Sequence, residues 1–483
     1  MKILLMSPFM SYKDRWGQYY LGAGDTFPQG IGVIAGYLEQ HGYDVDVIEP
    51  DVIGMDQDDF ESFIKNSDYL LVGISTFTPN VVFAYETAKI IKRLKPETFI
   101  VAGGAHPTLF PQRTLEECQH IEFTVTNEGE LPMLRLIQCL ESGSGDFYQV
   151  PNLFFRDNGI IVESKQKNDS WIDLDELPIF PYHKFDMKRY TPAPSLRTVL
   201  PTFNYMAQRG CPFSCSFCDT RTHGKRVRYR SVENVINDLK YLKSEFGIKG
   251  IIFEGSNFTV NKSWITDLCT RMIEEKLNLT WYCMGRVDFD QELLPLMKKS
   301  GLWAMSFGIE TGNEKTLKLM SKKISLAQAK STIRILNKLH VRSIGSFILG
   351  YPKENKEDVL NTINYACSLG LDVAVFFNPV PYPGTTLYDH AQADGGLLKD
   401  PPSWSDYRAW LDHNNPIYIN PLLGDLQVKL YNLAVKKFYS RPSYIFSQFL
   451  KIRTISDVKR LCKGFQSIKA LVIKGFKVDQ NDK

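Results

Sequence analysis

The chain has 483 residues, of which 43% are hydrophobic and 23% charged, and its formal net charge at pH 7 is +3. One hydrophobic core rarely organises so long a chain, so two or three soluble globular domains are expected. The small net charge argues against a nucleic-acid partner, and without an apolar run of about 20 residues no membrane span is predicted. The short apolar start lacks a cleavage site and the nine cysteines are scattered, which favours a reducing, cytoplasmic location.

Residues 1–140 alternate strand and helix patterns, which is typical of a Rossmann-like parallel sheet covered by helices on both faces. Strands are predicted at 2–6, 44–48, 69–75, 98–102 and 123–126, and helices at 31–41 and 79–94. Ligands of such sheets bind beyond the carboxyl ends of the strands. Those ends carry the candidate binding residues Ser75, Thr76, Gly103, Gly104, Glu128 and Gly129. In the alternative, this is a plain Rossmann-like domain whose glycines only form turns.

Residues 141–200 interrupt this alternation and are expected to link two domains. A small hairpin is predicted at 152–162, because Asp157, Asn158 and Gly159 favour a tight turn between two short apolar runs. The stretch that follows is rich in proline, acidic and aromatic residues, which is typical of a connector held by its aromatic side chains. We assign this linker no chemistry.

Three of the nine cysteines, Cys211, Cys215 and Cys218, lie on one short segment and are separated by three and then two residues. A strand-like apolar run at 203–207 precedes them, and a basic stretch at 221–230 follows. Three thiolates on one loop are suited to hold one face of a 4Fe–4S cluster, because closely spaced turns bring their sulfurs together. One iron would then lack a protein ligand, so it could bind a substrate.

The same cysteines permit a second interpretation, a structural zinc site. Cys211, Cys215 and Cys218, together with His223 five residues further on, would form a Cys₃His set of the kind that zinc binds in tetrahedral geometry. Under this interpretation the segment would stabilise the fold and carry no redox chemistry. The segment by itself leaves both possibilities open.

Residues 201–400 again alternate strand and helix patterns, six times in all. The predicted strands lie at 204–208, 250–253, 280–284, 303–308, 343–349 and 373–377. Two of the intervening helices are predicted at 232–246, with Ser231 as the N-cap, and at 357–369. Six such units form a partial (β/α)₆ barrel of the TIM type, whose chemistry is expected at the carboxyl ends of the strands. The cysteine segment follows the first strand and therefore lies at such an end.

The spacing of Cys211, Cys215 and Cys218 resembles the CxxxCxxC signature of the radical SAM superfamily, and the aromatic Phe217 fits that pattern. In that family S-adenosylmethionine chelates the open iron of the cluster through its amino and carboxylate groups. The resemblance implies an enzyme that reductively cleaves S-adenosylmethionine at a 4Fe–4S cluster. It also implies an electron donor such as flavodoxin or ferredoxin.

The segments 28–32, 75–76 and 103–108, in that order, resemble the cobalamin-binding domain that precedes many radical SAM barrels. The resemblance therefore implies cobalamin as a further cofactor. The Asp-x-His-x-x-Gly segment that gives cobalt a histidine in other cobalamin proteins is absent between Ser7 and Gly30, so cobalamin is expected without a protein histidine as lower ligand. His106 could approach the corrin, or it could only cap a turn.

Two barrel segments resemble the parts of the family that contact S-adenosylmethionine. Glu310, at the end of the fourth strand, matches the acidic residue that bonds the ribose hydroxyls, although a carboxylate that only caps a helix is the alternative. Arg286, after the third strand, could hold the carboxylate of S-adenosylmethionine, or it could form an ion pair with Asp288 or Glu310.

Two further residues near strand ends are candidates for chemistry. The second strand end departs from the family, which often has two acids there, and Glu254 is the residue that could replace one of them. Cys283 could donate a hydrogen atom to a radical, but a free cysteine more often acts as a small buried hydrophobe.

Residues 401–483 are predicted to form a helical C-terminal region. From Lys451 onward nine basic residues stand against three acidic ones, with Phe, Ile and Leu between them. A solvated helical face is one interpretation of this pattern. The other is an amphipathic surface that contacts a membrane or a lipid-like substrate, which would make the cytoplasmic protein peripheral to a membrane.

The resemblance implies methylation of an unactivated carbon in a small-molecule or lipid-like substrate, because this is the commonest outcome of the domain pair. Ring formation or oxidation, as in the anaerobic magnesium-protoporphyrin ester cyclases, is the alternative within the family. A non-catalytic sensor that binds cobalamin or zinc is the alternative from another class of protein.

Overall fold

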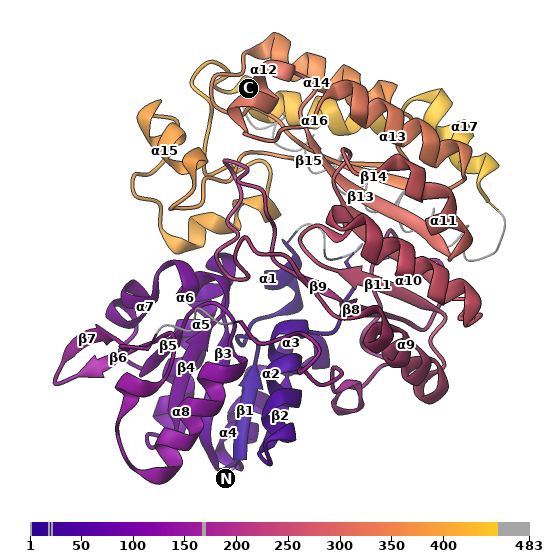
Figure 1. Ribbon diagram of the computed structural model, residues 1–483. Coiled ribbons are helices and arrows are strands. Elements are labelled where there is room, and N and C mark those ends of the chain that lie inside the picture. The colour runs from indigo at the N-terminus through magenta and orange to yellow at the C-terminus, as the bar shows by residue number, and fades with distance from the viewer. Residues whose placement is uncertain (1, 18–19, 21–22, 167–170, 453–483) are drawn as a thin grey trace.

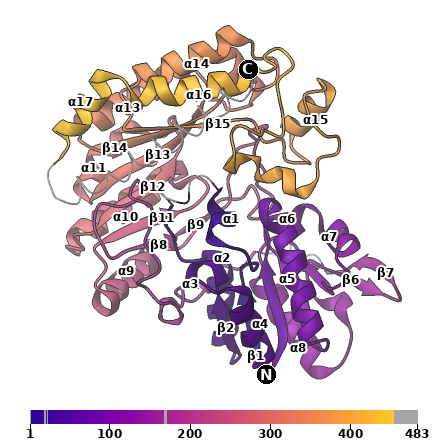
Figure 2. The ribbon, with the colours of Figure 1, turned by 180° about the vertical axis from the view of Figure 1, so that it is seen from behind.

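The computed structural model describes residues 2–17, 20, 23–166 and 171–452, and its two large sheets stand side by side (Figures 1 and 2). The N-terminal sheet has seven strands in the order β2-β1-β3-β4-β5-β6-β7. They are β1 (Lys2–Met6), β2 (Asp44–Ile48), β3 (Tyr69–Ser75), β4 (Phe99–Gly103), β5 (Phe123–Val125), β6 (Leu153–Asp157) and β7 (Ile160–Glu163). The first five run parallel, whereas β6 and β7 form a hairpin that joins β5 in antiparallel fashion.

The central strands β1, β3 and β4 are apolar along most of their length because helices cover both faces of the sheet. These helices include α2 (Gln29–Gln40), α4 (Gln57–Lys65), α5 (Val81–Leu94), α7 (Pro111–Glu117) and α8 (Glu130–Ser142). Within β1, Ile3 and Leu5 pack with α2 and α8, while Leu4 and Met6 pack with α4, α5 and α7 on the other face. Alternate side chains of one strand therefore fill two separate cores, which confirms the predicted Rossmann-like sheet.

The second sheet has six strands in the order β8-β11-β12-β13-β14-β15, and every neighbouring pair is parallel. They are β8 (Thr202–Met206), β11 (Gly250–Glu254), β12 (Thr280–Gly285), β13 (Leu302–Glu310), β14 (Arg342–Ile348) and β15 (Val373–Phe377). The helices that cover it are α9 (Val232–Phe246), α10 (Lys262–Glu274), α11 (Leu294–Lys299), α13 (Leu326–Lys338) and α14 (Lys356–Ser368). Ser231 caps α9, since its side chain accepts the Asn234 N–H at 3.2 Å. The predicted partial (β/α)₆ barrel is confirmed.

The first barrel strand begins and ends two residues earlier than the predicted range 204–208. Met206 pairs with Glu254, the last residue of β11, so no partner remains in that strand for residues beyond Met206. The chain then turns away, and β9 (Gln208–Arg209) pairs antiparallel with β10 (Arg228–Tyr229). This two-residue ladder closes the base of the cysteine segment.

The C-terminal region is helical, as predicted, and packs against both the N-terminal unit and the barrel. It contains the 3₁₀ segment η7 (Trp404–Leu411), α16 (Leu426–Tyr439) and α17 (Pro442–Leu450), and α15 (Thr386–Ala393) precedes it. Helix α16 lies on the outside of the barrel beside α14, and η7 packs through Trp404 and Tyr407 against Val81 of the N-terminal unit. Most of the predicted basic tail, residues 453–483, lies outside the described residues. In the ranges that the structure describes, no helix is long and apolar enough to cross a membrane.

Candidate functional site

A cavity of about 1020 Å³ lies between the carboxyl ends of the strands of the two sheets. The N-terminal unit contributes Ser7, Ser75, Gly103, Gly104, Glu128 and Gly129 to its wall, and the barrel contributes Met206, Arg209, Cys211, Cys218, Glu254 and Ser256. Ligands of both sheet types bind at these strand ends. The volume is at the upper end of the ordinary range for ligand pockets, so the chamber suits a large ligand or more than one small one.

The three predicted cysteines lie together at the end of β8. Cys218 N donates to Cys215 O at 3.0 Å, which closes a tight turn, and Cys211 N donates to Gly224 O at 3.1 Å. Burial raises the pKa of Cys218 to about 11, and the neighbouring thiols of Cys215 and Cys211 add to that shift. Without metal the thiol of Cys218 is therefore neutral, and binding a cluster would release its proton.

Ser216, between the cysteines, ties their segment to three other parts of the barrel. Its N–H donates to Met320 O at 3.0 Å, its hydroxyl lies 2.7 Å from that of Tyr351, and its carbonyl accepts Leu387 N at 2.8 Å. Met320 follows α12 (Glu314–Leu319), Tyr351 follows β14 and Leu387 lies in α15. These three contacts anchor the middle of the cysteine segment to the rest of the chain.

Glu354 holds the loop that carries Tyr351 and is itself only 1% exposed. Its Oε2 accepts Gly350 N at 3.1 Å and Tyr351 N at 3.0 Å, and its Oε1 accepts the Thr311 hydroxyl at 3.1 Å. Burial raises the pKa of Glu354 to about 7, and the hydrogen bonds oppose but do not cancel this effect.

The carboxyl of Glu354 predicts a pH-dependent stability. The folded state holds its proton up to a pKa of about 7, against an ordinary value of 4.5 for an exposed glutamate. The free energy of unfolding should therefore fall as the pH rises through this window, by about 3 kcal/mol from this one group. Glu354→Gln should remove that part of the slope, while Glu49 and Glu254, whose pKa values are also raised to about 7, keep theirs. Denaturant unfolding of the metal-free wild type and of Glu354→Gln across this pH range measures the free energy of unfolding. If the variant kept the same pH dependence as the wild type, the raised pKa of Glu354 would be contradicted.

His223 does not complete a zinc site with the cysteines. Its Nδ1 lies 2.8 Å from Glu128 Oε1 of the N-terminal unit. Among the residues that the structure describes, no three His, Cys, Asp or Glu side chains are grouped so as to hold one metal ion. A cubane spreads its ligands over three irons, so a wider set of three thiols fits it where a single zinc ion would need a fourth ligand nearby.

Glu310 ends β13 and is 6% exposed. Its φ is +70°, a left-handed conformation that is uncommon outside glycine, and it turns the side chain back along the strand. A Cβ at Gly308 would overlap Glu310 Oε1, so a larger residue there would displace this side chain. Lys322 Nζ donates to the same Oε1 at 2.7 Å. Sequence analysis missed Lys322, because nothing in the local pattern of its loop separates it from the solvated lysines beside it.

Arg286 is also 6% exposed, and its contacts show the ion pair that was the alternative to ligand binding. Its Nε and Nη2 donate to Asp288 at 2.9 and 2.8 Å, and Nη2 also donates to Lys322 O at 2.7 Å. Nη1 is buried and has no hydrogen-bond partner in the described structure. The guanidinium lies 3.7 Å from the centre of the Phe213 ring. A buried donor without a partner is costly, so Nη1 is free to bind an added acceptor.

These charges converge on the cysteines. Burial raises the pKa of Cys215, and the cations of Lys322 and Arg286 partly oppose this shift, which places both near its thiol. Glu310 acts on the same thiol in the opposite direction. The structure therefore brings the two predicted residues of the later strand ends to the cysteine segment.

The strand ends of the N-terminal unit form the opposite wall of the cavity. Ser75, Gly103 and Gly104 line it, whereas Thr76 is fully buried behind them, with Thr76 N donating to Gly103 O at 2.7 Å. Gly104 has a φ of +104°, and a Cβ there would lie 2.8 Å from Thr76 O. Only glycine fits this position, and it leaves backbone open to a flat ligand.

His106 does not line the cavity. It is fully buried, its Nδ1 lies 3.1 Å from the Thr78 hydroxyl, and its ring packs edge-on against Trp404 at 4.6 Å. Burial lowers its pKa to about 3, so the ring is neutral, and its Nε2 has no partner in the described structure. These contacts favour a packing role over an approach to a ligand.

Glu254 and Cys283 differ in their access to the cavity. Glu254 lines it, and Asn204 Nδ2 donates to its Oε1 at 3.0 Å. Cys283 is fully buried within the barrel core, where burial raises its pKa well above the usual value. This position favours the small hydrophobe over a hydrogen-atom donor.

Two protein families match the chain in the order of its two units. The B12 binding domain matches residues 22–137, and the radical SAM superfamily matches residues 205–384. The chain is 32% identical to an uncharacterized methyltransferase of Pyrococcus horikoshii, over 90% of this chain and 93% of that protein. It is 28% identical to the anaerobic magnesium-protoporphyrin IX monomethyl ester cyclase of Rubrivivax gelatinosus, over 76% of this chain and 66% of that protein.

The fold is shared with a solved methyltransferase. The radical S-adenosylmethionine methyltransferase TsrM of Kitasatospora setae, with tryptophan and a SAM analogue bound, superposes with a TM-score of 0.70 over 92% of this chain and 90% of that one. The sequences are 16% identical, so this likeness concerns the fold. The family matches and the full-length relative, together with the cysteine segment at the end of β8, lead to one conclusion. The chain belongs to the radical SAM enzymes that carry an N-terminal B12-binding domain, a family whose cofactors are a 4Fe–4S cluster, S-adenosylmethionine and cobalamin.

Proposed function

We propose that the protein transfers a methyl group from S-adenosylmethionine to a carbon atom of a small-molecule substrate. The observation that carries this proposal is the cavity in which Cys211 and Cys218 face Gly103 and Gly104 of the B12-binding domain. A radical generator and a methyl carrier have to reach the same substrate atom, and a shared chamber permits that. The similarity to a methyltransferase along nearly the whole chain supports this outcome.

Each cofactor has residues suited to hold it. The thiolates of Cys211, Cys215 and Cys218 would ligate three irons of the cluster. The Glu310 carboxylate, oriented by Lys322, would accept the ribose hydroxyls of S-adenosylmethionine.

The carboxylate of S-adenosylmethionine and the corrin have candidate partners as well. The unpartnered Nη1 of Arg286 would bind the carboxylate, and the backbone at Gly103 and Gly104 would lie against the corrin. Among the described residues that line the cavity, the one histidine is His223 of the barrel, which is bound to Glu128.

When bound and reduced, the cluster would supply one electron for the cleavage of S-adenosylmethionine, and cobalamin would supply the methyl group for transfer. The chain's own residues orient the bound groups and shield the charged side chains of the site from water. Phe213 covers the guanidinium of Arg286, and Phe217 lies 5.6 Å from Lys322 Nζ, so both cations are kept from bulk water. In a dry site their charges act more strongly on a bound anion.

The test is anaerobic incubation of the iron-reconstituted protein with S-adenosylmethionine, deuterated in its methyl group, hydroxocobalamin and a strong reductant. The expected products are 5′-deoxyadenosine and cobalamin that has gained the labelled methyl group, both measured by mass spectrometry. Absence of 5′-deoxyadenosine would sink the proposal. A colourless protein with zinc and no iron would favour a non-catalytic sensor instead.

Ring formation or oxidation is the second candidate, and the similarity to the ester cyclase favours it. Product mass separates the two outcomes. A product that gains one labelled methyl group excludes simple cyclisation, whereas 5′-deoxyadenosine without label in cobalamin or product would favour the cyclase-like outcome.

An acidic electron carrier such as flavodoxin or ferredoxin is the proposed electron donor. Arg221, Lys225 and Arg226, on the loop that carries Cys218, are exposed cations. Complementary charge would guide an acidic carrier to this loop.

Helix α17 supports a peripheral membrane contact. Phe446 and Phe449 are 66% and 65% exposed, close to Ile445 and Leu450, which are also exposed, and the basic tail follows. Replacing both phenylalanines with serine should weaken binding to vesicles of anionic lipid at least about tenfold, because apolar insertion and basic charge act together. Sedimentation measures it, with Ile160→Ser (69% exposed) as the matched control. Equal partitioning of wild type, double variant and a chain shortened after Leu450 would contradict the contact.

A further inference from the structure

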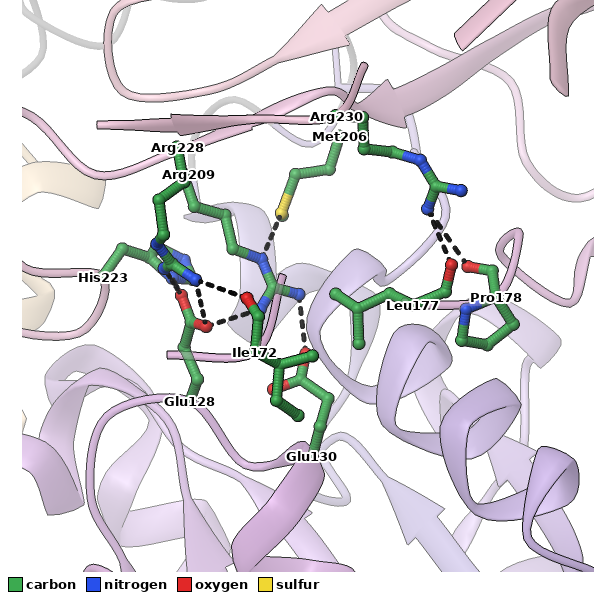
Figure 3. A network of polar contacts seen from close by, with 10 residues as sticks. All are labelled: Glu128, Glu130, Ile172, Leu177, Pro178, Met206, Arg209, His223, Arg228 and Arg230. Atoms are coloured by element: carbon green, nitrogen blue, oxygen red, sulfur yellow. Dashed lines mark hydrogen bonds and ion pairs between the residues drawn. The ribbon is translucent and has the colours of Figure 1, made fainter. Parts of the chain in front are cut away.

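Two arginines at the base of the cysteine loop reach across to the B12-binding domain (Figure 3). Arg209 of β9 and Arg228 of β10 are direct partners in the two-residue antiparallel ladder. Side chains of such partners lie side by side on one face of the ladder. Two guanidinium groups placed together repel each other unless an acidic group bridges them, and here Glu128 contacts both (Figure 3).

The contacts form a closed network. Arg209 Nη1 lies 3.0 Å from Glu128 Oε2, and its Nη2 donates to Glu130 Oε1 at 2.6 Å. Arg228 binds the same Glu128 with both terminal nitrogens, one of them at 3.1 Å from Oε2. His223 Nδ1 is the third group on Glu128. Figure 3 shows the arginines and His223 converging on Glu128 from the barrel side.

Burial makes these charges depend on one another. The side chains of Arg209 and Glu130 are each 4% exposed, that of Glu128 is 8% exposed, and that of Arg228 is 10% exposed. Burial by itself would raise the pKa of Glu128, but His223, Arg209 and Arg228 outweigh it and hold the pKa at about 2. A buried ion pair tolerates the loss of one member poorly, because the other charge is then left without a partner.

The network grips both ends of the loop that carries the cysteines. Arg209 lies two residues before Cys211, and Arg228 closes the loop on the far side of Cys218. Glu128 and Glu130 flank the end of β5 and the start of α8, and both line the cavity beside Gly103 and Gly104. Buried ion pairs therefore join the strand-end wall of the B12-binding domain to both ends of the cysteine loop.

We propose that Glu128 and Glu130, with Arg209 and Arg228, form an inter-domain clamp that couples cobalamin binding to cluster binding, so that each cofactor tightens the site of the other. The four residues are positioning residues, because they act through the loop and the strand end. The inference rests on the proposed function, since it needs both cofactors to be bound by this chain. It also assigns Glu128 to the contact between the two domains. Both of its carboxylate oxygens are already bound by Arg209, Arg228 and His223, which favours this role over a direct contact with cobalamin.

Coupling of this kind is reciprocal. If a bound cluster fixes the loop in the shape that the clamp requires, it also fixes the end of β5 that cobalamin meets, and the reverse holds by the same free energy. The measured quantity is the ratio of two dissociation constants for hydroxocobalamin. One is measured on the metal-free protein and the other on the same preparation after anaerobic reconstitution with iron and sulfide.

For the wild type we expect hydroxocobalamin to bind about tenfold more tightly after reconstitution, and for Glu128→Gln we expect the ratio to fall to about one. The glutamine keeps the size of the side chain and removes its charge. Arg228→Gln is the second variant and should fold even if Glu128→Gln does not, because Arg209 still binds both glutamates. Its ratio of dissociation constants is expected to fall to about one as well. Lys184→Gln is the matched control: it removes the ion pair of Lys184 with Glu39, 2.6 Å long, which joins the linker to α2 away from the loop.

The clamp would be overturned if the wild type bound hydroxocobalamin equally tightly before and after reconstitution. It would also be overturned if Glu128→Gln and Arg228→Gln both kept the tenfold ratio expected of the wild type. Loss of the ratio in Lys184→Gln as well would show a general loosening of the domains and would equally overturn it. These measurements need no turnover, so they are independent of whether 5′-deoxyadenosine forms. A failure of the proposed function appears as missing 5′-deoxyadenosine, and a failure of the clamp appears only in the binding ratio.

Discussion

Serine in place of Cys211, Cys215 or Cys218 is expected to remove most of the bound iron and to reduce 5′-deoxyadenosine formation by at least about a thousandfold. A serine oxygen is a poor ligand for cluster iron, and the segment offers no substitute thiol. The triple variant should lose both iron and product completely. Iron analysis, the visible absorption of the cluster and chromatography of 5′-deoxyadenosine after anaerobic incubation measure the effect.

The matched control for the cysteine variants is Cys367→Ser. Cys367 is partly buried in α14 and lies outside the cavity wall, so its loss should change neither iron content nor product. The hydrogen bonds of Ser216 to Met320, Tyr351 and Leu387 do not depend on the thiols, so the variants should keep their fold. Product formation by the triple variant at the wild-type rate would refute the assignment of the cluster.

Glu310→Gln is expected to weaken the binding of S-adenosylmethionine by about 10- to 100-fold. A hydrogen bond to a charged group contributes about 1.5–3 kcal/mol, and glutamine offers the ribose hydroxyls one neutral acceptor in place of a carboxylate. The amide oxygen can still accept from Lys322 Nζ, which limits the damage to the fold. Equilibrium dialysis of labelled S-adenosylmethionine against the iron-reconstituted protein measures the dissociation constant.

Glu314→Gln provides the control for this prediction. Glu314 begins α12 (Glu314–Leu319), is exposed, and accepts Leu326 N at 2.9 Å, so it shares the chemistry of Glu310 without facing the cysteines. The dissociation constant of this variant should equal that of the wild type. If Glu310→Gln bound S-adenosylmethionine as tightly as the control, the carboxylate would have only a structural role with Lys322.

The ion pair of Glu310 and Lys322 belongs to the same binding site. Both side chains are nearly inaccessible to water, so removing either member leaves a buried charge without a partner. Lys322 also opposes the raised pKa of Cys215, which indicates that its charge reaches the cysteine segment. The residues that would bind S-adenosylmethionine and those that would bind the cluster are therefore electrostatically linked, as expected where one ligand contacts both.

Features set by short-range pattern were predictable from the sequence. The spacing of Cys211, Cys215 and Cys218 and the alternation of strand and helix depend on neighbours a few positions apart. The predicted helix 232–246 has its observed bounds because the Ser231 cap and the apolar period act locally. The first barrel strand was predicted two residues late, because its end is set by where β11 stops, which its own residues do not show.

Only the tertiary structure decided which side chains meet. Glu128 and Arg228 are 100 positions apart, and their pairing depends on how two separately folded sheets dock, for which neither local sequence carries a signal. His106 faces Trp404 from nearly 300 positions away, which removes it from the cavity. Lys322 reaches Glu310 because a loop after α12 folds back over β13. The sequence by itself therefore determined the fold class, the family resemblance and the cluster segment, whereas long-range packing decided the partners of each charged residue.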